Sequence, residues 1–311
     1  MRTQLSVLSR LARVGLATLL ALVVLLSVVA SGYTQSIGRI FLPLVQQPGD
    51  AEQEVASTTS EQEVSSTITE TVTEGQAEGG RPKPRPTIVL VHGAWADGTG
   101  WQEVIKRLVR EDYPVIAVQN PLTSLADDVA TTKRVLDAQT GPTIVVGHSY
   151  GGAVITGAAV GNPNVKALVY IAAFAPAVGE PIGALLQQYP TELSQILEFD
   201  AAGFGYLNRS RFRAVFAADV DRTTAAIMAA AQKPAFGGIF AEHLDAVAWA
   251  TIPTWYMVAK EDKALSPAME RFLAQRMGAT TVEIKASHVP FISEPSEVVK
   301  FIEKAVRATV P

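Results

Sequence analysis

A serine between two glycines is the strongest candidate for a chemical site in the chain. Gly147, Ser149 and Gly151 follow a G-x-S-x-G spacing at the end of the apolar stretch TIVVG. On a sharp turn from a strand into a helix, this spacing exposes the serine as a nucleophile and leaves no room for side chains two places to either side. A glycine-rich break between a buried strand and a helix would look the same. The pattern therefore predicts a catalytic serine only if its partners lie at suitable places.

A nucleophilic serine needs a base, and the base needs a carboxylate that orients it. Of the four histidines, His288 is the one that follows a late strand-like stretch, TTVEIKA. Glu261 and Asp262 follow the strand-like stretch before it, TWYMVA. Because the carboxyl ends of parallel strands meet at one edge of a sheet, we expect these residues near Ser149. The chain order Ser149, Asp262, His288 is a known order of a Ser–His–Asp triad.

The same chemistry needs donors for the negative charge that develops on a carbonyl oxygen. We expect one donor to be the backbone N–H of Tyr150, directly after the serine. The second is expected at Ala94, in the loop HGAW that follows the first strand-like stretch. His92 and Gly93 would shape this loop and let its backbone approach the site.

The other marked residues have structural explanations. His148 is expected to pack or hydrogen-bond beneath the turn, and His243 to be a partly exposed helix residue. Trp95 and Trp101 could each line a pocket or pack in the core. No histidines are paired at ligand spacing and the chain has no cysteine, so we expect no metal site. The stretch GHSYGG lacks the ending of a phosphate-binding loop, and we expect no cofactor.

Strand-like and helix-like stretches alternate along most of the chain from residue 87. Short apolar runs indicate buried parallel strands, and runs with one apolar helical face follow them. The alternation predicts an α/β domain whose mostly parallel sheet carries helices on both faces. The expected strands are 87–93, 114–120, 143–147, 165–174, 254–259 and 280–286, and the expected helices are 100–112, 124–140, 149–161, 266–278 and 295–308.

The alternation breaks at residues 176–250, which are rich in Ala, Phe and Leu. We expect a helical lid insertion here, with part of its apolar surface packed on itself and part lining an apolar pocket. The candidates for these positions are Leu185, Leu186, Phe204, Phe212, Phe216, Ile227, Met228 and Phe236.

Residues 1–86 precede this pattern, and we place the domain at 87–311. Residues 1–32 combine arginines with the uncharged apolar run 14–30, which favours a signal peptide or an uncleaved membrane anchor. Either would carry the rest of the chain out of the cytoplasm, secreted or tethered to the membrane. Residues 33–86 are acidic, rich in Ser and Thr, and end in a proline-rich spacer, which is typical of a disordered linker.

The charge of the chain gives no indication of a nucleic-acid partner. The formal net charge is -4, the pI is about 5.7, and the segment 87–311 has no run of Lys and Arg. The length and the 48% hydrophobic content suit one domain with an extensive core.

Three segments resemble the α/β-hydrolase superfamily: HGAWADGTGW, GHSYGG and KEDKALSPAMERFLAQRM…EIKASHVPFISEPSEV. Within it they look like the branch that holds plant methylesterases, hydroxynitrile lyases and their bacterial relatives. The resemblance covers residues 87 to about 310. It implies that Asp262, rather than Glu261, is the triad acid. Hydroxynitrile lyases carry a lysine directly after the catalytic histidine, and Val289 at this place argues against lyase activity.

These features predict a cofactor-free serine hydrolase that cleaves a small, largely apolar carboxylic ester. Ser149 would be the nucleophile, His288 the base and Asp262 the acid, and the expected partner is the small-molecule substrate. A C–C lyase, or a cofactor-free haloperoxidase or perhydrolase, could use the same triad. A ligand-binding homologue with a silent triad is the alternative from another class. Such a binder has no physical need for an intact triad with both oxyanion loops.

Overall fold

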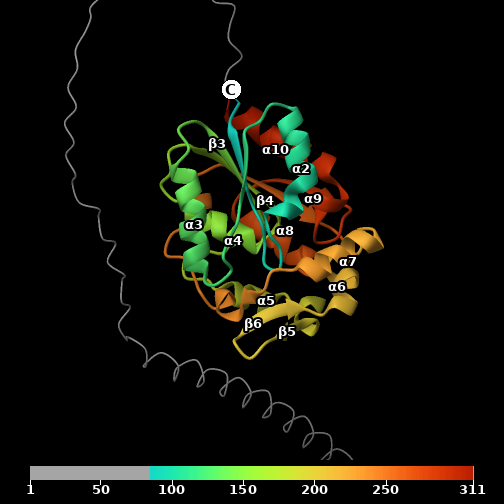
Figure 1. Cartoon of the computed structure of the whole chain (residues 1–311). Coiled ribbons are helices and arrows are strands. Elements are labelled where there is room, and N and C mark those ends of the chain that lie inside the picture. The colour runs from blue at the N-terminus through green and yellow to red at the C-terminus, as the bar shows by residue number, and fades with distance from the viewer. Residues whose placement is uncertain (1–84, 311) are drawn as a thin grey trace, which may run out of the picture. The chain divides into compact units, whose positions relative to one another are not determined.

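Six parallel strands form the central sheet of the computed structural model, which describes residues 85–310 (Figure 1). The central strands are short runs of Val, Ile, Leu and Ala with buried side chains, as expected for a parallel sheet covered on both faces. The predicted α/β fold is therefore confirmed. From one edge to the other, the strands are β2 (Val115–Val118), β1 (Thr87–Val91), β3 (Thr143–Ser149), β4 (Val165–Ala173), β8 (Thr254–Ala259) and β9 (Thr280–Ile284).

Helices cover both faces of this sheet. Figure 1 shows α3 (Leu125–Asp137) and α4 (Tyr150–Ala158) on one side, with α2 (Gln102–Arg110) and α10 (Pro295–Thr309) on the other. Each of these helices coincides with a stretch in which the sequence predicts a helix. The remaining elements of this part are η1 (Gly98–Trp101), α8 (Pro267–Arg276) and α9 (Pro290–Ser293).

The start of α3 shows how the sequence sets a helix boundary. The Oγ of Ser124 accepts a hydrogen bond from the backbone N–H of Asp127 at 3.0 Å, which satisfies one of the free donors at the helix start. The carboxylate of Asp127 accepts from the Thr123 hydroxyl at 3.1 Å. Ser124 is thus the N-cap of α3.

The lid lies at one end of the domain, at the bottom of Figure 1. It is less purely helical than predicted, because a three-stranded antiparallel sheet, β5-β6-β7, is built into it. The turn between its first two strands is set by Asp200, whose carboxylate accepts from the N–H groups of Ala202 and Phe204 at 2.9 Å. The lid contains α5 (Ile182–Gln188), η2 (Glu192–Gln195), β5 (Leu197–Phe199), β6 (Phe204–Leu207), α6 (Arg209–Phe216), α7 (Arg222–Ala231), β7 (Ala235–Phe236), η3 (Gly237–Phe240) and η4 (Ala248–Ala250).

Hydrogen bonds tie the lid to loops at the ends of the strands, and two of them start from the loops after β1 and β2. The indole Nε1 of Trp95, after β1, donates to the carbonyl of Gly205 in β6 at 3.1 Å. The N–H of Phe236 donates to the carbonyl of Leu122, after β2, at 2.9 Å. The lid therefore packs where the chemistry of an open α/β sheet is expected.

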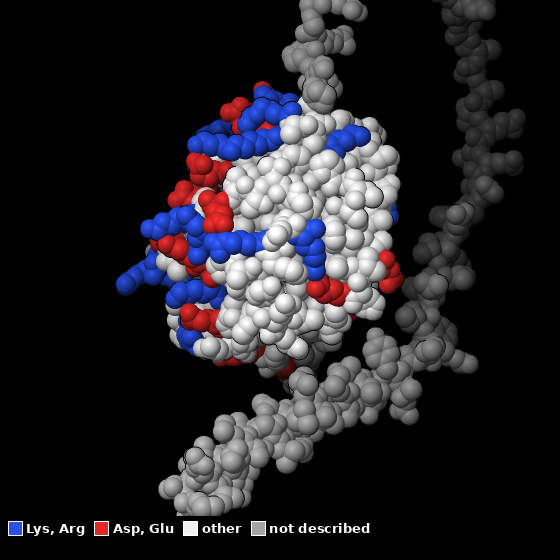
Figure 2. All heavy atoms as spheres, turned by 180° about the vertical axis from the view of Figure 1, so that it is seen from behind, with Lys and Arg blue, Asp and Glu red and all other residues white. Residues whose placement is uncertain are grey.

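The signal peptide or anchor expected at 1–32 and most of the linker expected at 33–86 lie outside the described residues. Within 85–310, none of the helices is long and apolar enough to cross a bilayer. Figure 2 shows the face behind the view of Figure 1, where basic and acidic side chains intermingle along one side of a broad uncharged area.

Candidate active site

Ser149 lies at the junction of β3 and α4 with φ 53° and ψ -125°, a strained conformation for a residue other than glycine. The turn is accommodated because the positions two residues to either side, 147 and 151, are glycines. A Cβ on Gly147 would lie 2.7 Å from the carbonyl oxygen of Gly151, and a Cβ on Gly151 would lie 2.5 Å from the oxygen of Val91. The G-x-S-x-G spacing thus has the mechanical role that the sequence predicts, and it places Ser149 at the end of the sheet.

The structure brings Asp262, and not Glu261, to His288. The Nδ1 of His288 lies 2.6 Å from the Oδ2 of Asp262, and both side chains are buried. The other carboxylate oxygen accepts from the N–H groups of Ala264 and Leu265 at 2.7 and 2.8 Å. Glu261 instead lies at the surface, with its carboxylate 3.8 Å from the Nζ of Lys285.

This contact with Asp262 orients the imidazole of His288. Because Asp262 accepts a hydrogen bond at Nδ1, that nitrogen carries the proton and Nε2 is left to take another. Among the described hydrogen bonds, none joins the Ser149 hydroxyl to His288. Such bonds are often long in a ligand-free enzyme and tighten when substrate binds.

His148 links the nucleophile turn to the base. Its Nε2 donates to the main-chain carbonyl of His288 at 2.8 Å, and the two imidazole rings lie 4.7 Å apart. Burial, with a smaller contribution from His288, lowers the pKa of His148 well below its ordinary value, so the ring is neutral. The hydrogen-bonding position expected for it beneath the turn is the one observed.

Ala94 and Tyr150, the expected oxyanion donors, flank the serine. A Cβ on Gly93 would lie 2.7 Å from the Cβ of Ser149, so the loop after β1 approaches the nucleophile at this glycine. Tyr150 is the first residue of α4, where backbone N–H groups have no partner within the helix. Neither the N–H of Ala94 nor that of Tyr150 has an acceptor among the described residues, as a donor to an oxyanion would require.

His92 holds the oxyanion loop in shape. Its Nδ1 donates to the carbonyl of Gly93 at 2.8 Å, and its Nε2 accepts from the N–H of Asn120 at 3.0 Å. Burial is the main cause that lowers the pKa of His92 to about 4, so the ring is neutral near pH 7. The structural role that the sequence indicates for His92 fits this geometry.

Asp128 is a site residue that the sequence reasoning missed. Its buried carboxylate accepts from the Tyr150 hydroxyl at 2.7 Å and from the N–H of Leu122 at 2.8 Å. Burial raises its pKa above the ordinary value. In the sequence it is one of two adjacent aspartates on an amphipathic helix, and nothing there distinguishes it from its exposed neighbour Asp127.

A cavity of about 70 Å³ lies against His148 and Val289, the sequence neighbours of Ser149 and His288. Its walls are largely apolar and come from the oxyanion loop, α6, α7 and α9. Neither Ser149 nor His288 is among the lining residues, and only 4% of Ser149 and 1% of His288 are exposed. Two lining residues contact His288: the rings of Phe216 and His148 each lie 4.7 Å from its imidazole. The main apolar side chains are Trp95, Phe212, Phe216, Met228, Val289 and Phe291.

Several lid side chains fall into the two groups that the sequence predicts, but Ile227 belongs to neither, because it is 62% exposed. Phe212, Phe216 and Met228 line the cavity. Phe204 and Phe236 pack on each other instead, with ring centroids 5.6 Å apart. Of the two tryptophans whose places the sequence leaves open, Trp95 lines the cavity, whereas Trp101 is fully buried against Phe291 at 4.3 Å.

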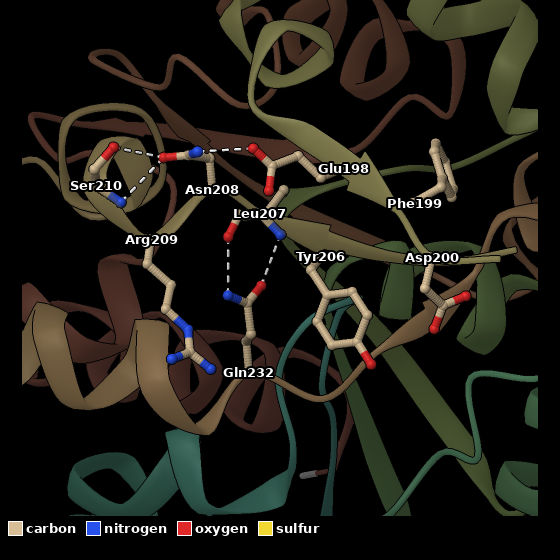
Figure 3. Close-up of a pocket in the computed structure, with 9 residues that line it drawn as sticks. All are labelled: Glu198, Phe199, Asp200, Tyr206, Leu207, Asn208, Arg209, Ser210 and Gln232. Atoms are coloured by element: carbon tan, nitrogen blue, oxygen red, sulfur yellow. Dashed lines mark hydrogen bonds between the residues drawn. The ribbon is translucent and has the colours of Figure 1, made fainter. Parts of the chain in front are cut away.

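A larger hollow of about 510 Å³ lies in the lid, away from the triad (Figure 3). Some of its polar side chains are bonded within the protein, whereas Arg209 and Tyr206 make no described side-chain hydrogen bond. The amide of Gln232 bonds both backbone groups of Leu207 at 2.8 and 2.9 Å, and Asn208 donates to Glu198 at 2.7 Å. The smaller cavity, whose walls include His148 and Val289 next to the candidate triad residues in the sequence, is the better candidate for a substrate pocket.

Residues 85–310 offer no candidate metal-binding site. This described part of the chain contains no group of three or more His, Cys, Asp or Glu side chains placed to hold a metal ion.

His243 lies in a loop of the lid rather than in the expected helix, with its ring exposed and 3.7 Å from the carboxylate of Asp245. The prediction of a helical position for His243 was therefore wrong.

Known proteins share the architecture. The family model described as the alpha/beta hydrolase family matches residues 88–301. An α/β hydrolase of Aspergillus novofumigatus is 27% identical over 245 residues, which cover 71% of this chain and 96% of that protein.

Solved structures give the same fold. A pyrethroid hydrolase from Sphingobium faniae has a TM-score of 0.64 at 23% identity, covering 72% of this chain and 98% of that one. A methylesterase from Arabidopsis has a TM-score of 0.62 at 16% identity, covering 72% of this chain and 99% of that one. The resemblance found in the three sequence segments is confirmed. Since the family model spans most of its length, the chain belongs to the α/β-hydrolase family.

Proposed function

We propose that this chain is a serine esterase that hydrolyses small, largely apolar carboxylic esters through an acyl-enzyme. The observation that carries the proposal is the buried 2.6 Å contact between His288 and Asp262. It is supported by the hydrogen bond from His148, the residue before Ser149, to the carbonyl of His288. The Arabidopsis methylesterase and the Sphingobium pyrethroid hydrolase, which share the fold, support a hydrolytic reaction.

In the acylation step, the Oγ of Ser149 gives its proton to the Nε2 of His288 and forms a bond to the ester carbonyl carbon. The carbonyl oxygen becomes an oxyanion and accepts hydrogen bonds from the N–H groups of Ala94 and Tyr150. Each such donor lowers a barrier of this kind by about 3 kcal/mol. The carbon–oxygen bond to the alcohol then breaks, and His288 returns the proton to the leaving alcohol.

Deacylation repeats these steps with water. His288 takes a proton from water, whose oxygen attacks the acyl carbon. When the tetrahedral intermediate collapses, the acid leaves and Ser149 recovers its proton. Asp262 keeps its charge throughout, and it stabilises the imidazolium that forms twice in the cycle.

The size of the substrate follows from the cavity. A volume of about 70 Å³ beside the base holds a short acyl or alkoxy group, and the aromatic walls favour an apolar one. We therefore expect short-chain esters to be better substrates than long-chain esters.

The experiment is a hydrolysis screen of p-nitrophenyl esters of rising acyl length, with Ser149→Ala as the control. Activity that Ser149→Ala abolishes is the expected result. Labelling of Ser149 by a fluorophosphonate separates the enzyme from a silent binder, whose misaligned triad would not react. A protein that is labelled at Ser149 but has no esterase activity would instead favour a lyase or perhydrolase that uses the same triad.

For localisation, we propose that residues 1–32 direct the domain out of the cytoplasm, as a cleaved signal peptide or as an anchor. The apolar run 14–30 behind arginines supports this. Fractionation of cells that express the full chain, or the chain from residue 33, tests it. Esterase activity in the cytoplasmic fraction for both forms would contradict the proposal.

A further inference from the structure

The lid holds the residue directly before the catalytic base. Asp219 lies in the segment between α6 and α7, and one of its carboxylate oxygens accepts from the backbone N–H of Ser287 at 3.0 Å. The other accepts from the Ser287 hydroxyl. Ser287 is buried, with 1% of it exposed, and the next residue is His288. One lid carboxylate thus holds both polar groups of the residue that precedes the base.

The neighbouring residues of this loop are held from other elements. The N–H of Glu261 donates to the carbonyl of Ala286 at 3.0 Å, and His148 holds the carbonyl of His288. Three consecutive residues are therefore fixed, by the acid loop, the lid and the nucleophile turn. Asp219 is the one attachment of the three that comes from the lid.

A second contact joins the same part of the lid to the base. Phe216, the last residue of α6 and three residues before Asp219, packs its ring edge against the imidazole of His288 at 4.7 Å. The end of α6 and the segment after it therefore contact the base loop through both an apolar face and a charged hydrogen-bonding group.

From these contacts we propose that Asp219 is a positioning residue that holds the loop of His288 and couples the lid to the base. The inference rests on the proposed function, in which His288 takes the proton of Ser149. Hydrogen bonds to a carboxylate are stronger and more directional than neutral ones. A displacement of about 1 Å at a catalytic group can cost on the order of 100-fold in rate.

Asp221 offers a matched control two residues away. Its carboxylate accepts from the N–H groups of Thr223 and Thr224 at 3.0 Å and caps α7, with no contact to the base loop. Asn is as good an N-cap as Asp, so Asp221→Asn removes the same charge from the same segment while keeping the cap.

The experiment compares Asp219→Ala, Asp219→Asn and Asp221→Asn in the full chain by kcat, KM, melting temperature and the rate of fluorophosphonate labelling. We expect Asp219→Ala to lower both kcat and the labelling rate by about 10- to 100-fold with KM little changed. Asp219→Asn, which keeps one acceptor, should recover part of the rate. Asp221→Asn should match the wild type.

Ser287→Ala extends the test, because it removes the hydroxyl and leaves the backbone N–H bonded to Asp219. If the carboxylate acts through Ser287, Asp219→Ala should cost less in the Ser287→Ala background than in the wild type. Active-site titration ensures that the rates refer to folded enzyme.

Three results would overturn the proposal. These are an unchanged labelling rate in Asp219→Ala, a change in KM alone, and equal effects of Asp219→Ala and Asp221→Asn. A wild type that labels with fluorophosphonate but hydrolyses no ester would refute the esterase function only, and the labelling rates would still decide the role of Asp219. A wild type inert to both would refute the triad, and Asp219 would have no base to position.

Discussion

The Nδ1 of His288 lies 2.6 Å from the Oδ2 of Asp262, and the residue before the acid, Glu261, points to the surface. The two adjacent acids therefore have different roles, and substitution separates them. Ser149→Ala, His288→Ala and Asp262→Asn should each lower kcat by about 10⁴-fold or more, because each removes one member of a unit that acts together. Melting temperatures should show that the variants are folded.

The control for this series is Glu261→Gln, which removes a surface charge 3.8 Å from Lys285 and should leave kcat within about twofold, as surface substitutions usually do. A severe loss of kcat in Glu261→Gln, with a mild loss in Asp262→Asn, would show that Glu261 and not Asp262 is the triad acid. Retention of the rate within tenfold in any triad variant would remove that residue from the mechanism.

The glycines of the turn give a prediction of stability. A Cβ on Gly151 would lie 2.5 Å from the backbone oxygen of Val91, and backbone cannot yield as a flexible side chain can. Gly151→Ala should therefore lower the free energy of unfolding by at least about 1–3 kcal/mol and reduce activity strongly. Gly141→Ala is the matched control, since no atom lies within 4 Å of its Cβ position. Urea unfolding measures both, and equal stability of the two variants would contradict the prediction.

Much of the sheet and the candidate triad could be predicted because local rules act strongly there. A buried parallel strand needs an uninterrupted apolar run, and the turn at Ser149 tolerates nothing larger than glycine at Gly151. The motifs at the ends of the strands then lie at one edge of the sheet. This is how residues as far apart as Ser149 and His288 could be grouped from the sequence.

The missed features depend on long-range contacts. The antiparallel sheet of the lid is made of strands of two to four residues, too short for a periodic pattern. Asp128 and Asp219 resemble their neighbours Asp127 and Asp221 in the sequence, and only the fold shows which of each pair meets the site. Substrate specificity is equally hidden, because it depends on how the lid packs against the domain.

Glu270 in α8 gives a prediction of pH dependence. Its side chain is fully buried, with Oε2 accepting from the N–H of Ala259 at 3.0 Å and Oε1 without a partner among the described residues. Burial, and then the charge of Asp262, raise the pKa of Glu270 well above its ordinary value. The native state therefore keeps a proton that the unfolded chain releases above about pH 4.3.

Because the folded state holds this proton more tightly, its contribution to stability is complete below the unfolded pKa and is lost as the pH rises through the folded pKa. Glu270→Gln, which imitates the neutral acid, should remove this loss. The variant should gain stability relative to the wild type by up to about 1.4 kcal/mol per pH unit in that window. Urea unfolding between pH 5 and 8 measures the difference, with the exposed Glu111→Gln as control. Parallel curves for wild type and Glu270→Gln would show that Glu270 is ionised in the native state.

The cavity beside the base leads to a prediction of substrate preference. Met228 on α7 lines it, whereas the next residue back along the helix, Ile227, is 62% exposed and faces away. Met228→Ala should enlarge the cavity and admit longer acyl groups. Each buried methylene is worth about 0.8 kcal/mol, or roughly fourfold in kcat/KM. The ratio of kcat/KM for p-nitrophenyl butyrate over acetate should therefore rise by about 4- to 15-fold.

The control is Ile227→Ala, which truncates a side chain of similar size on the same helix and should leave this ratio unchanged. If both variants shift the ratio alike, the effect comes from loosening of α7. If neither does, the acyl group binds elsewhere than in this cavity.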